Sequence, residues 1–293
     1  MFDSFLEEFS QKIGLAEDAA RTLMQTYDTV KEHPLYTELS QMLSNTADFK
    51  QLEERCMAAA QTLGIHHYTF MMTLLCGNVR LMKARYLESG VKEKIFWDTA
   101  VDFRCKIEEC KRVYGVWGIF AFEWYRFLFE AKIFKLGRLE FERREDGNIG
   151  IHIPSCGPLD YEEVLDSYRR AYAFFGGFEG EPMPLLCHSY LLFPAYQENV
   201  FAETSNIHRF VKDFQIIRVD ESKVFRDAWR VYGTFYNGDV SVLPQNTSLQ
   251  RAFTAYIKKG GAFGVGLGLL LIDGKTVRTD RHDLIEKYAK PYR

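Results

Sequence analysis

The chain has 293 residues, of which 47% are hydrophobic and 26% are charged. These fractions are typical of a globular protein, and the length favours two domains over one. The net charge of -3 gives no general attraction to nucleic-acid phosphates or anionic membranes, so we expect neither as a partner.

The beginning of the chain and its cysteines indicate a cytoplasmic protein. Met1 is followed by an acidic amphipathic pattern rather than by a positively charged leader and an apolar segment. The six cysteines include no CxxC or CxxH pair, so no zinc site is predicted. The scatter of the cysteines fits a reducing compartment.

Residues 1–129 are predicted to form a helical N-terminal domain. Apolar residues recur at spacings of three and four, and Pro34 is the only proline between Ser4 and Phe129. The clearest stripe predicts a single helix that carries Tyr68, Met71, Met72, Leu75, Val79, Met82 and Tyr86. Glycines that typically follow helix ends are found at Gly64, Gly90 and Gly115.

A β-hairpin is predicted directly after this helical part. The segments 134–144 and 148–153 alternate between apolar and polar residues and flank a turn that contains Gly147. If Gly147 takes the left-handed conformation and closes a loop over 145–147, Arg144 pairs with Asn148. Phe141 then lies opposite Ile151, and Glu140 lies opposite His152.

The remaining residues predict a mixed α/β domain over 130–293, so the whole chain has an α+β fold. Helices are expected from Asp160 to Gly176, from Ser205 to about Phe214, over 222–232 and over 248–259. Strands are expected over 185–193, 215–219 and 262–273. This alternation is typical of helices packed on a sheet.

His152 is the first candidate catalytic residue. Its neighbours on the strand are apolar, so its side chain points to the other face, opposite Glu140. A carboxylate next to an imidazole fixes the tautomer of the ring and supports a general base. The alternative is a polar cross-strand pair on a solvated face.

The segment Cys187–Tyr190 also contains reactive side chains. On a strand Cys187 and Ser189 share one face, and His188 and Tyr190 share the other. A Cys187–His188 dyad is therefore excluded, whereas His188 and Tyr190 are candidates for donating a proton. Cys187 and Ser189 are either core residues or part of the wall of a pocket that holds a cofactor.

Two further features could contact a ligand. Gly264 and Gly266 lie in a strand pattern without a following helix, which does not fit a dinucleotide fingerprint. Such glycines admit either a close protein neighbour or a flat ligand. Asn206 at a helix start either binds an anion or simply belongs to a capped helix.

Several segments together resemble a family of bacterial acyltransferase-domain proteins, which join an N-acyltransferase N-terminal domain to a GNAT-like C-terminal domain. They are 133–142, 151–159, 187–192, 205–207, 247–252 and 260–266. The resemblance implies acyl transfer from acetyl-CoA or another acyl-CoA to an amine of a small molecule or peptide. The usual GNAT pyrophosphate signature, Gln/Arg-x-x-Gly-x-Gly/Ala, is missing from the sequence.

Three hypotheses for function follow. In the first, an N-acyltransferase uses His152 as base, Glu140 to orient it, and His188 or Tyr190 as donor to the leaving thiolate. In the second, the protein is a non-catalytic ligand-binding or protein-interaction module. In the third, Cys156 or Cys187 is the nucleophile of a cysteine hydrolase, which requires a histidine within hydrogen-bond reach.

Overall fold

The computed structural model describes residues 4–45, 48–144, 146–155, 157–176 and 181–292. The chain divides into two compact units, Met1–Phe134 and Lys135–Arg293. Two sequence features, Cys156 and the glycine at position 177 that follows Gly176, lie outside the described residues.

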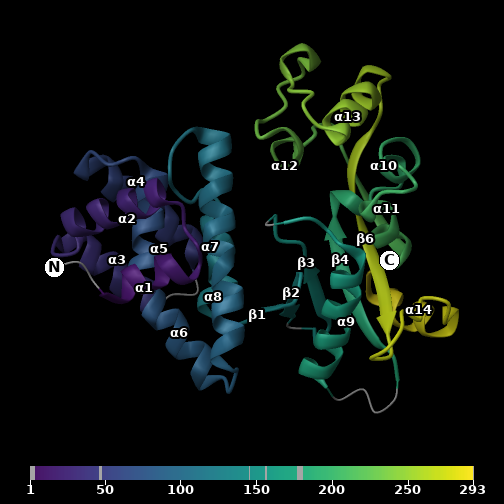
Figure 1. The fold of residues 1–293 in the computed structure, drawn as a ribbon, viewed down its shortest axis with the longest axis horizontal. Helices are drawn as coiled ribbons and strands as arrows, with labels where there is room; N and C mark the ends of the chain where they lie inside the picture. The colour runs from purple at the N-terminus through teal and green to yellow at the C-terminus, as the bar shows by residue number, and fades with distance from the viewer. Residues whose placement is uncertain (1–3, 46–47, 145, 156, 177–180, 293) are drawn as a thin grey trace. The chain divides into compact units, whose positions relative to one another are not determined.

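The first unit is helical (Figure 1). Its elements are α1 (Ser4–Lys12), α2 (Glu17–Val30), α3 (Pro34–Asn45), α4 (Phe49–Leu63), α5 (His67–Gly77), α6 (Val79–Glu88), α7 (Glu93–Tyr114), η1 (Phe122–Trp124) and α8 (Tyr125–Phe129). Large aromatic side chains such as Phe9, Phe70 and Phe103 are completely buried. The predicted helix ends are confirmed, since Gly64 and Gly115 cap α4 and α7 in the left-handed conformation.

The long helix predicted through Tyr68 and Tyr86 is wrong in one respect. It is divided into α5 and α6 at Asn78, which ends one helix and precedes the next. Gly77 lies against the Tyr27 ring and the Tyr36 hydroxyl, where a Cβ atom would not fit. The residues of the predicted stripe, Tyr68 apart, are nevertheless buried as expected.

The second unit is built on a mixed sheet, as the sequence predicted. The strands of this sheet are β1 (Ile133–Leu136), whose first two residues belong to the first unit, β2 (Leu139–Arg143), β3 (Ile149–His152), β4 (Met183–Ser189), β5 (Gln215–Ser222) and β6 (Phe263–Ile272). They lie in the order β1-β2-β3-β4-β6-β5. The pair β3 and β4 is parallel, whereas β2 and β3, β4 and β6, and β5 and β6 are antiparallel.

The register of the predicted hairpin is confirmed. Phe141 pairs with Ile151 and Glu140 pairs with His152. The backbone N–H of Arg144 donates to the carbonyl of Asn148 at 2.9 Å, and Gly147 has a φ of 82°. A glycine at this position allows the turn without the steric cost that a side chain would bring.

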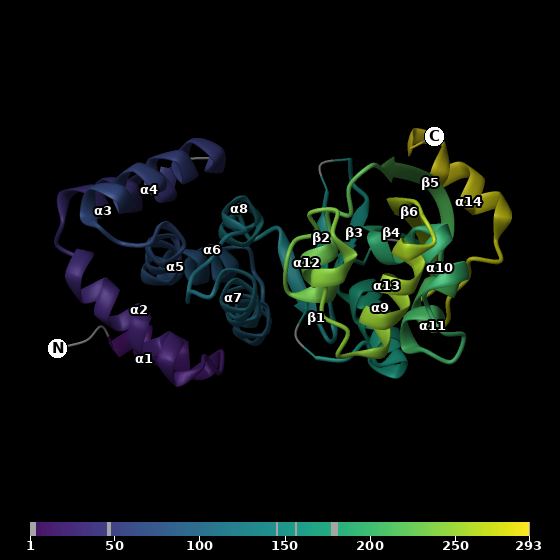
Figure 2. The ribbon, with the colours of Figure 1, turned by 90° about the horizontal axis from the view of Figure 1, so that it is seen from above.

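Helices cover both faces of this sheet, and α9 (Tyr161–Phe175) and α14 (His282–Ala289) lie on opposite sides of β4 and β6 (Figure 2). On what we call the α14 face, Ile285 and Ala289 pack against apolar residues of β4 and β6. On the other, the α9 face, lie Cys187 and the glycines of β6. Asp160 caps α9, as predicted, by accepting from the backbone amides of Glu162 and Glu163.

The remaining elements of this unit connect the strands. They are η2 (Tyr190–Leu192), α10 (Pro194–Asn199), α11 (Asn206–Lys212), α12 (Ala228–Tyr232), η3 (Val240–Val242), α13 (Ser248–Lys258) and η4 (Lys290–Tyr292). The helix predicted over 222–232 is wrong in its first half, because β5 continues to Ser222 and α12 begins only at Ala228. The pairing of Ser222 with Phe263 accounts for this extension.

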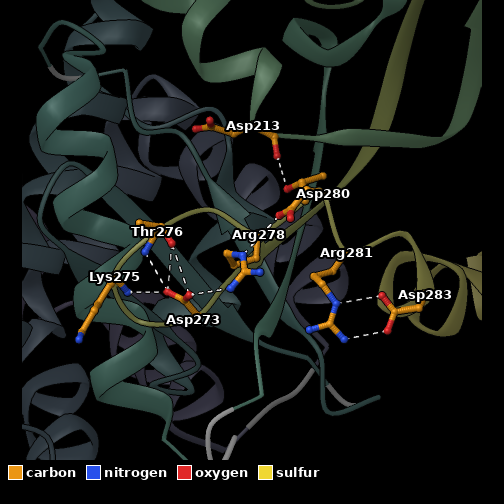
Figure 3. A network of polar contacts seen from close by, with 9 residues as sticks. Asp213, Asp273, Lys275, Thr276, Arg278, Asp280, Arg281 and Asp283 are labelled. Carbon is orange, nitrogen blue, oxygen red and sulfur yellow. Dashed lines mark hydrogen bonds and ion pairs between the residues drawn. The ribbon is translucent and has the colours of Figure 1, made fainter.

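The connection from β6 to α14 is held by a network of charged side chains (Figure 3). The Asp273 carboxylate accepts from the backbone amides of Lys275 and Thr276 and from the Arg278 guanidinium. The backbone amides and Arg278 together lower the pKa of Asp273 to about 2. Arg281 and Asp283 form a further ion pair at the start of α14.

No helix within the described part of the chain is long and apolar enough to span a bilayer.

Candidate active site

The parallel strands β3 and β4 define the place where the candidate residues meet. Their pairing ends at Ile151 and Cys187, while β4 remains paired with β6 as far as Ser189. The strands therefore part at the carboxyl end of β3, just before Pro154, which lacks an N–H group for a sheet. His152 and His188 are the next residues on the two strands, and alternation places both on the α14 face.

His152 forms a hydrogen bond with Glu142, a carboxylate that we did not predict beside it; Glu140, the predicted partner, is its neighbour in the strand register. The imidazole Nε2 lies 2.9 Å from Glu142 Oε2, and the two side chains are 28% and 13% exposed. Glu140 is opposite His152 in the register but is 1% exposed. The carboxylate that orients the ring in this contact is therefore the diagonal neighbour.

A glycine explains why the diagonal contact forms. Gly150 lies opposite Glu142, and a Cβ atom at Gly150 would be 3.4 Å from the Glu142 carboxylate and 2.9 Å from Arg144 Nε. The space above Gly150 is thus filled by these two long side chains. The Glu142 carboxylate can lean over the glycine toward His152 because no side chain separates them.

His188 has a carboxylate partner of its own. Its Nε2 lies 3.2 Å from Asp220 Oδ2 on β5, and both side chains are about half exposed. Arg218, two residues before Asp220 on the same strand, donates to both carboxylate oxygens at 3.0 to 3.1 Å. The Arg218 guanidinium, with help from His188, holds the pKa of Asp220 below its usual value.

Tyr190 does not lie on the strand that we predicted for it. β4 ends at Ser189, and Tyr190 begins the 3-10 turn η2, so the alternation of the strand no longer applies. Its ring lies 6.4 Å from that of Phe253 on α13. Burial raises the pKa of Tyr190 to about 12. The strand alternation that we used to place Tyr190 beside His188 therefore does not extend to Tyr190.

Cys187 and Ser189 have local, structural contacts. Cys187 is 1% exposed, and burial raises the pKa of its thiol to about 12. Such a thiol is protonated at neutral pH and is a poor nucleophile. The Ser189 hydroxyl caps η2 by accepting from the backbone amide of Leu191. A hydrolase based on Cys187 is therefore disfavoured, and Cys156 lies outside the described residues.

Other residues of the protein occupy the space above the glycines of β6. A Cβ atom at Gly264 would clash with the ring of Phe193, and one at Gly266 would clash with the backbone of Leu192. The interpretation of Gly264 and Gly266 as places for a flat ligand is therefore wrong. Asn206 is exposed on the first turn of α11, and Ser205, not Asn206, caps this helix.

The start of α9 does not fit a pyrophosphate. The first turn of a helix that follows a strand, as α9 follows β3, can bind phosphate through backbone amides that have no partner within the helix. Here Asp160 Oδ1 already accepts from the amides of Glu162 and Glu163, at 3.0 and 3.3 Å. The carboxylates of Glu162 and Glu163 add negative charge to the same turn. This arrangement agrees with the missing pyrophosphate signature.

Sequence reasoning missed Glu142, Asp220 and Arg218. The alternation of β2 contained a signal for Glu142, since it shares a face with Glu140 and faces a glycine. For Asp220 the signal was absent, because β5 pairs with a strand more than forty residues later in the chain. Among the described residues, no group of three or more His, Cys, Asp or Glu side chains is placed to hold a metal ion.

The fold and the site define a helical unit followed by a GNAT-like sheet. Residues 4–131 match the N-acyltransferase N-terminal domain, and residues 133–270 match the GNAT-like C-terminal domain. The chain therefore belongs to the proteins that join these two domains, and the resemblance inferred from its sequence is confirmed. No curated protein matches the chain.

Solved structures of acyltransferases share the fold. One, in complex with decanoyl-CoA and teicoplanin, is 20% identical with a TM-score of 0.73. Another, in complex with CoA and 10C-teicoplanin, is 20% identical with a TM-score of 0.72. Each comparison covers 92% of this chain and 88% of the other. At this level of identity the likeness establishes the fold.

Proposed function

We propose that this protein is an N-acyltransferase that moves an acyl group from acyl-CoA to the amine of a small-molecule or peptide acceptor. The observation that carries the proposal is the His152–Glu142 pair at the point where the parallel strands part. The two acyltransferase domains support the same conclusion. Structures with a similar fold hold decanoyl-CoA, octanoyl-CoA and teicoplanin, which favours a medium acyl chain and a peptide-like acceptor.

In the proposed reaction His152 accepts a proton from the acceptor nitrogen, and Glu142 holds the imidazole in position. The nitrogen then attacks the thioester carbonyl carbon, so that a C–N bond forms and the C–S bond breaks. The protein contributes mainly by aligning the two reactants and by removing the proton. Coenzyme A leaves as the thiol.

Release of coenzyme A thiol tests the proposal. Acetyl-, octanoyl- and decanoyl-CoA are each mixed with the protein and with peptide amines or a glycopeptide, and the acylated product is identified by mass spectrometry. We expect transfer with at least one donor, and a melting temperature that rises with the acyl-CoA that binds. Binding without transfer would support the non-catalytic module instead. No binding of any donor would contradict the acyltransferase and leave a non-catalytic module whose ligand is not a coenzyme A thioester.

Two matched variants test the roles of the carboxylates. Glu142→Gln removes the charge that contacts His152, whereas Glu140→Gln changes the residue opposite it in the register. We expect His152→Gln to lower kcat by about 10²- to 10⁴-fold, and Glu142→Gln to lower it more than Glu140→Gln does. Melting temperatures show whether each variant is folded. Equal activity of Glu142→Gln and wild type would remove Glu142 from the mechanism.

A further inference from the structure

A second imidazole–carboxylate pair lies on the same face as the first. His188 Nε2 contacts Asp220 Oδ2 at 3.2 Å, and Arg218 fixes Asp220 through both of its oxygens. The three side chains come from two strands, β4 and β5, that flank β6. Leu267 of β6 is the register partner of both His188 and Arg218. They are half exposed, so a substrate could reach them.

The register relates the second pair to the first. β3 and β4 pair in parallel up to Ile151 and Cys187, so His152 and His188 each lie one residue beyond the last pair. The two imidazoles therefore stand on either side of the point where the strands separate. A thioester between these strands would have His152 on one side and His188 on the other.

We infer that His188 is the catalytic acid that protonates the departing coenzyme A thiolate, and that Asp220 and Arg218 are positioning residues. This inference rests on the proposed N-acyltransferase function. In this step His188 acts as the imidazolium, with Nε2–H donating to Asp220; as the C–S bond breaks, the sulfur takes the Nδ1 proton and leaves a neutral ring. His188 then regains a proton from solvent, and His152 releases to solvent the proton that it took from the amine.

The contact with Asp220 determines which ring nitrogen of His188 donates the proton to the sulfur. Because Nε2 is held by the carboxylate, Nδ1 is the atom left to face the substrate. Within the part of the chain that the structure describes, Nδ1 of His188 has no hydrogen-bond partner. Arg218 keeps the Asp220 carboxylate ionised and fixed, so that the ring has one preferred orientation.

The acidity of the leaving group provides a sharp test. Two donors carry the same acyl group: acyl-CoA, and the thioester of 5-thio-2-nitrobenzoate, whose thiol is far more acidic. An alkyl thiolate gains from protonation as it leaves, whereas the aryl thiolate leaves without it. We expect His188→Gln to lower kcat/KM for acyl-CoA by about 10²- to 10⁴-fold, and to change the value for the aryl thioester little.

Variants on β5 complete the test. Asp220→Asn should follow the pattern of His188→Gln with a smaller loss, and Glu221→Gln, an exposed neighbour on the same strand, should behave as wild type on both donors. Equal losses of His188→Gln on the two donors, or no loss, would overturn the inference while leaving the proposed function intact. A wild-type protein that transfers nothing from acyl-CoA would overturn both.

Discussion

Asp213 is a buried carboxylate that makes stability depend on pH. It is 7% exposed, and it accepts a hydrogen bond from the Tyr161 hydroxyl at 2.8 Å. Burial raises the pKa of Asp213 from 3.8 to about 6, although the hydrogen bond from Tyr161 acts in the opposite direction. A folded protein that binds this proton more tightly than the unfolded chain is stabilised at low pH.

The sign of this effect gives a prediction. The contribution of Asp213 is fully present below pH 4 and is lost as the pH rises through about 6. A rise of the Asp213 pKa from 3.8 to about 6 corresponds to about 3 kcal/mol. The variant Asp213→Asn should therefore gain stability relative to wild type between pH 4 and pH 8. Hydrogen exchange of peptides from α9 and α11, corrected for the intrinsic exchange rate at each pH, measures the difference in stability between the variant and wild type.

An exposed aspartate is the control for this measurement. Asp280, whose side chain is 69% exposed, lies in the same unit, and Asp280→Asn should not reproduce the pH-dependent gain. If the difference in stability between Asp213→Asn and wild type were the same at pH 4 and at pH 8, the prediction would be wrong, because the Asp213 carboxyl would then have the same pKa in the folded and unfolded chains.

The thiol of Cys187 should be inert in the folded protein. It is buried and protonated at neutral pH, and alkylation requires an exposed thiolate. We expect iodoacetamide at pH 7.5 to leave Cys187 unmodified, and to modify it after unfolding in urea. Mass spectrometry of the peptide that contains residue 187 distinguishes the two states. Rapid alkylation of the native protein would restore the cysteine hydrolase hypothesis.

The positions of some side chains could be predicted from the sequence, and those of others could not. Alternation and one turn glycine were sufficient to place His152 on the correct face and in the correct register. They could not decide between Glu140 and Glu142, because side-chain direction depends on what fills the space over Gly150. Tyr190 could not be placed either, since the strand stops one residue earlier and the 3-10 turn reverses the pattern.

At the scale of elements, η2 is packed against the glycines of β6. Leu192 and Phe193 lie where side chains at Gly264, Gly266 and Gly268 would otherwise be. The close approach holds the end of β4, and with it His188, against β6. Glycine is required here because the neighbouring atoms belong to the backbone of Leu192 and to a packed aromatic ring.

Two glycine variants compare the close contact between Gly266 and η2 with the contact between Gly150 and a flexible side chain. Gly266→Ala places a methyl group against the backbone of Leu192, which cannot move without shifting η2. We expect a loss of about 1 to 3 kcal/mol. Gly150→Ala meets the end of the flexible Arg144 side chain, so its loss should be much smaller. Chemical denaturation measures both. Similar losses would mean that η2 adapts.

The elements of the second unit were predicted unevenly. Period-two patterns and glycines revealed the hairpin and β6, and capping residues revealed α9 and α11. The helix α14 was not predicted, although it covers the apolar side chains of β4 and β6 on one face. The leucines of β4 and β6 on this face must be shielded from water, but the sequence alone does not show which segment packs on them.

For the whole molecule, the boundary between the units lies at β1. We predicted it at residue 129, near the end of α8, and the compact units meet between Phe134 and Lys135. The first unit keeps Ile133 and Phe134, because the Tyr86 hydroxyl donates to the carbonyl of Ile133 and its ring packs against Phe134. The end of a helix is therefore not the end of its unit.

Fragments that end at different residues test this boundary. A fragment of residues 1–134 should be more stable than one of residues 1–129, which lacks the Ile133 carbonyl that accepts from Tyr86 and the Phe134 ring that packs against it. One such hydrogen bond contributes about 0.5 to 1.5 kcal/mol. Thermal unfolding by circular dichroism compares them, and Tyr86→Phe should reduce the difference. Equal melting temperatures would place the boundary at 129.

The edge position of β5 has a consequence for how the protein responds to heat. This strand pairs with β6 on one side, and it carries Asp220 and Arg218. Edge strands are among the first parts of a sheet to open locally. Warming would then release the partner of His188 while the rest of the sheet stays intact. If the protein is the proposed N-acyltransferase, the heat sensitivity of its turnover would thus be set by one strand rather than by the stability of the fold.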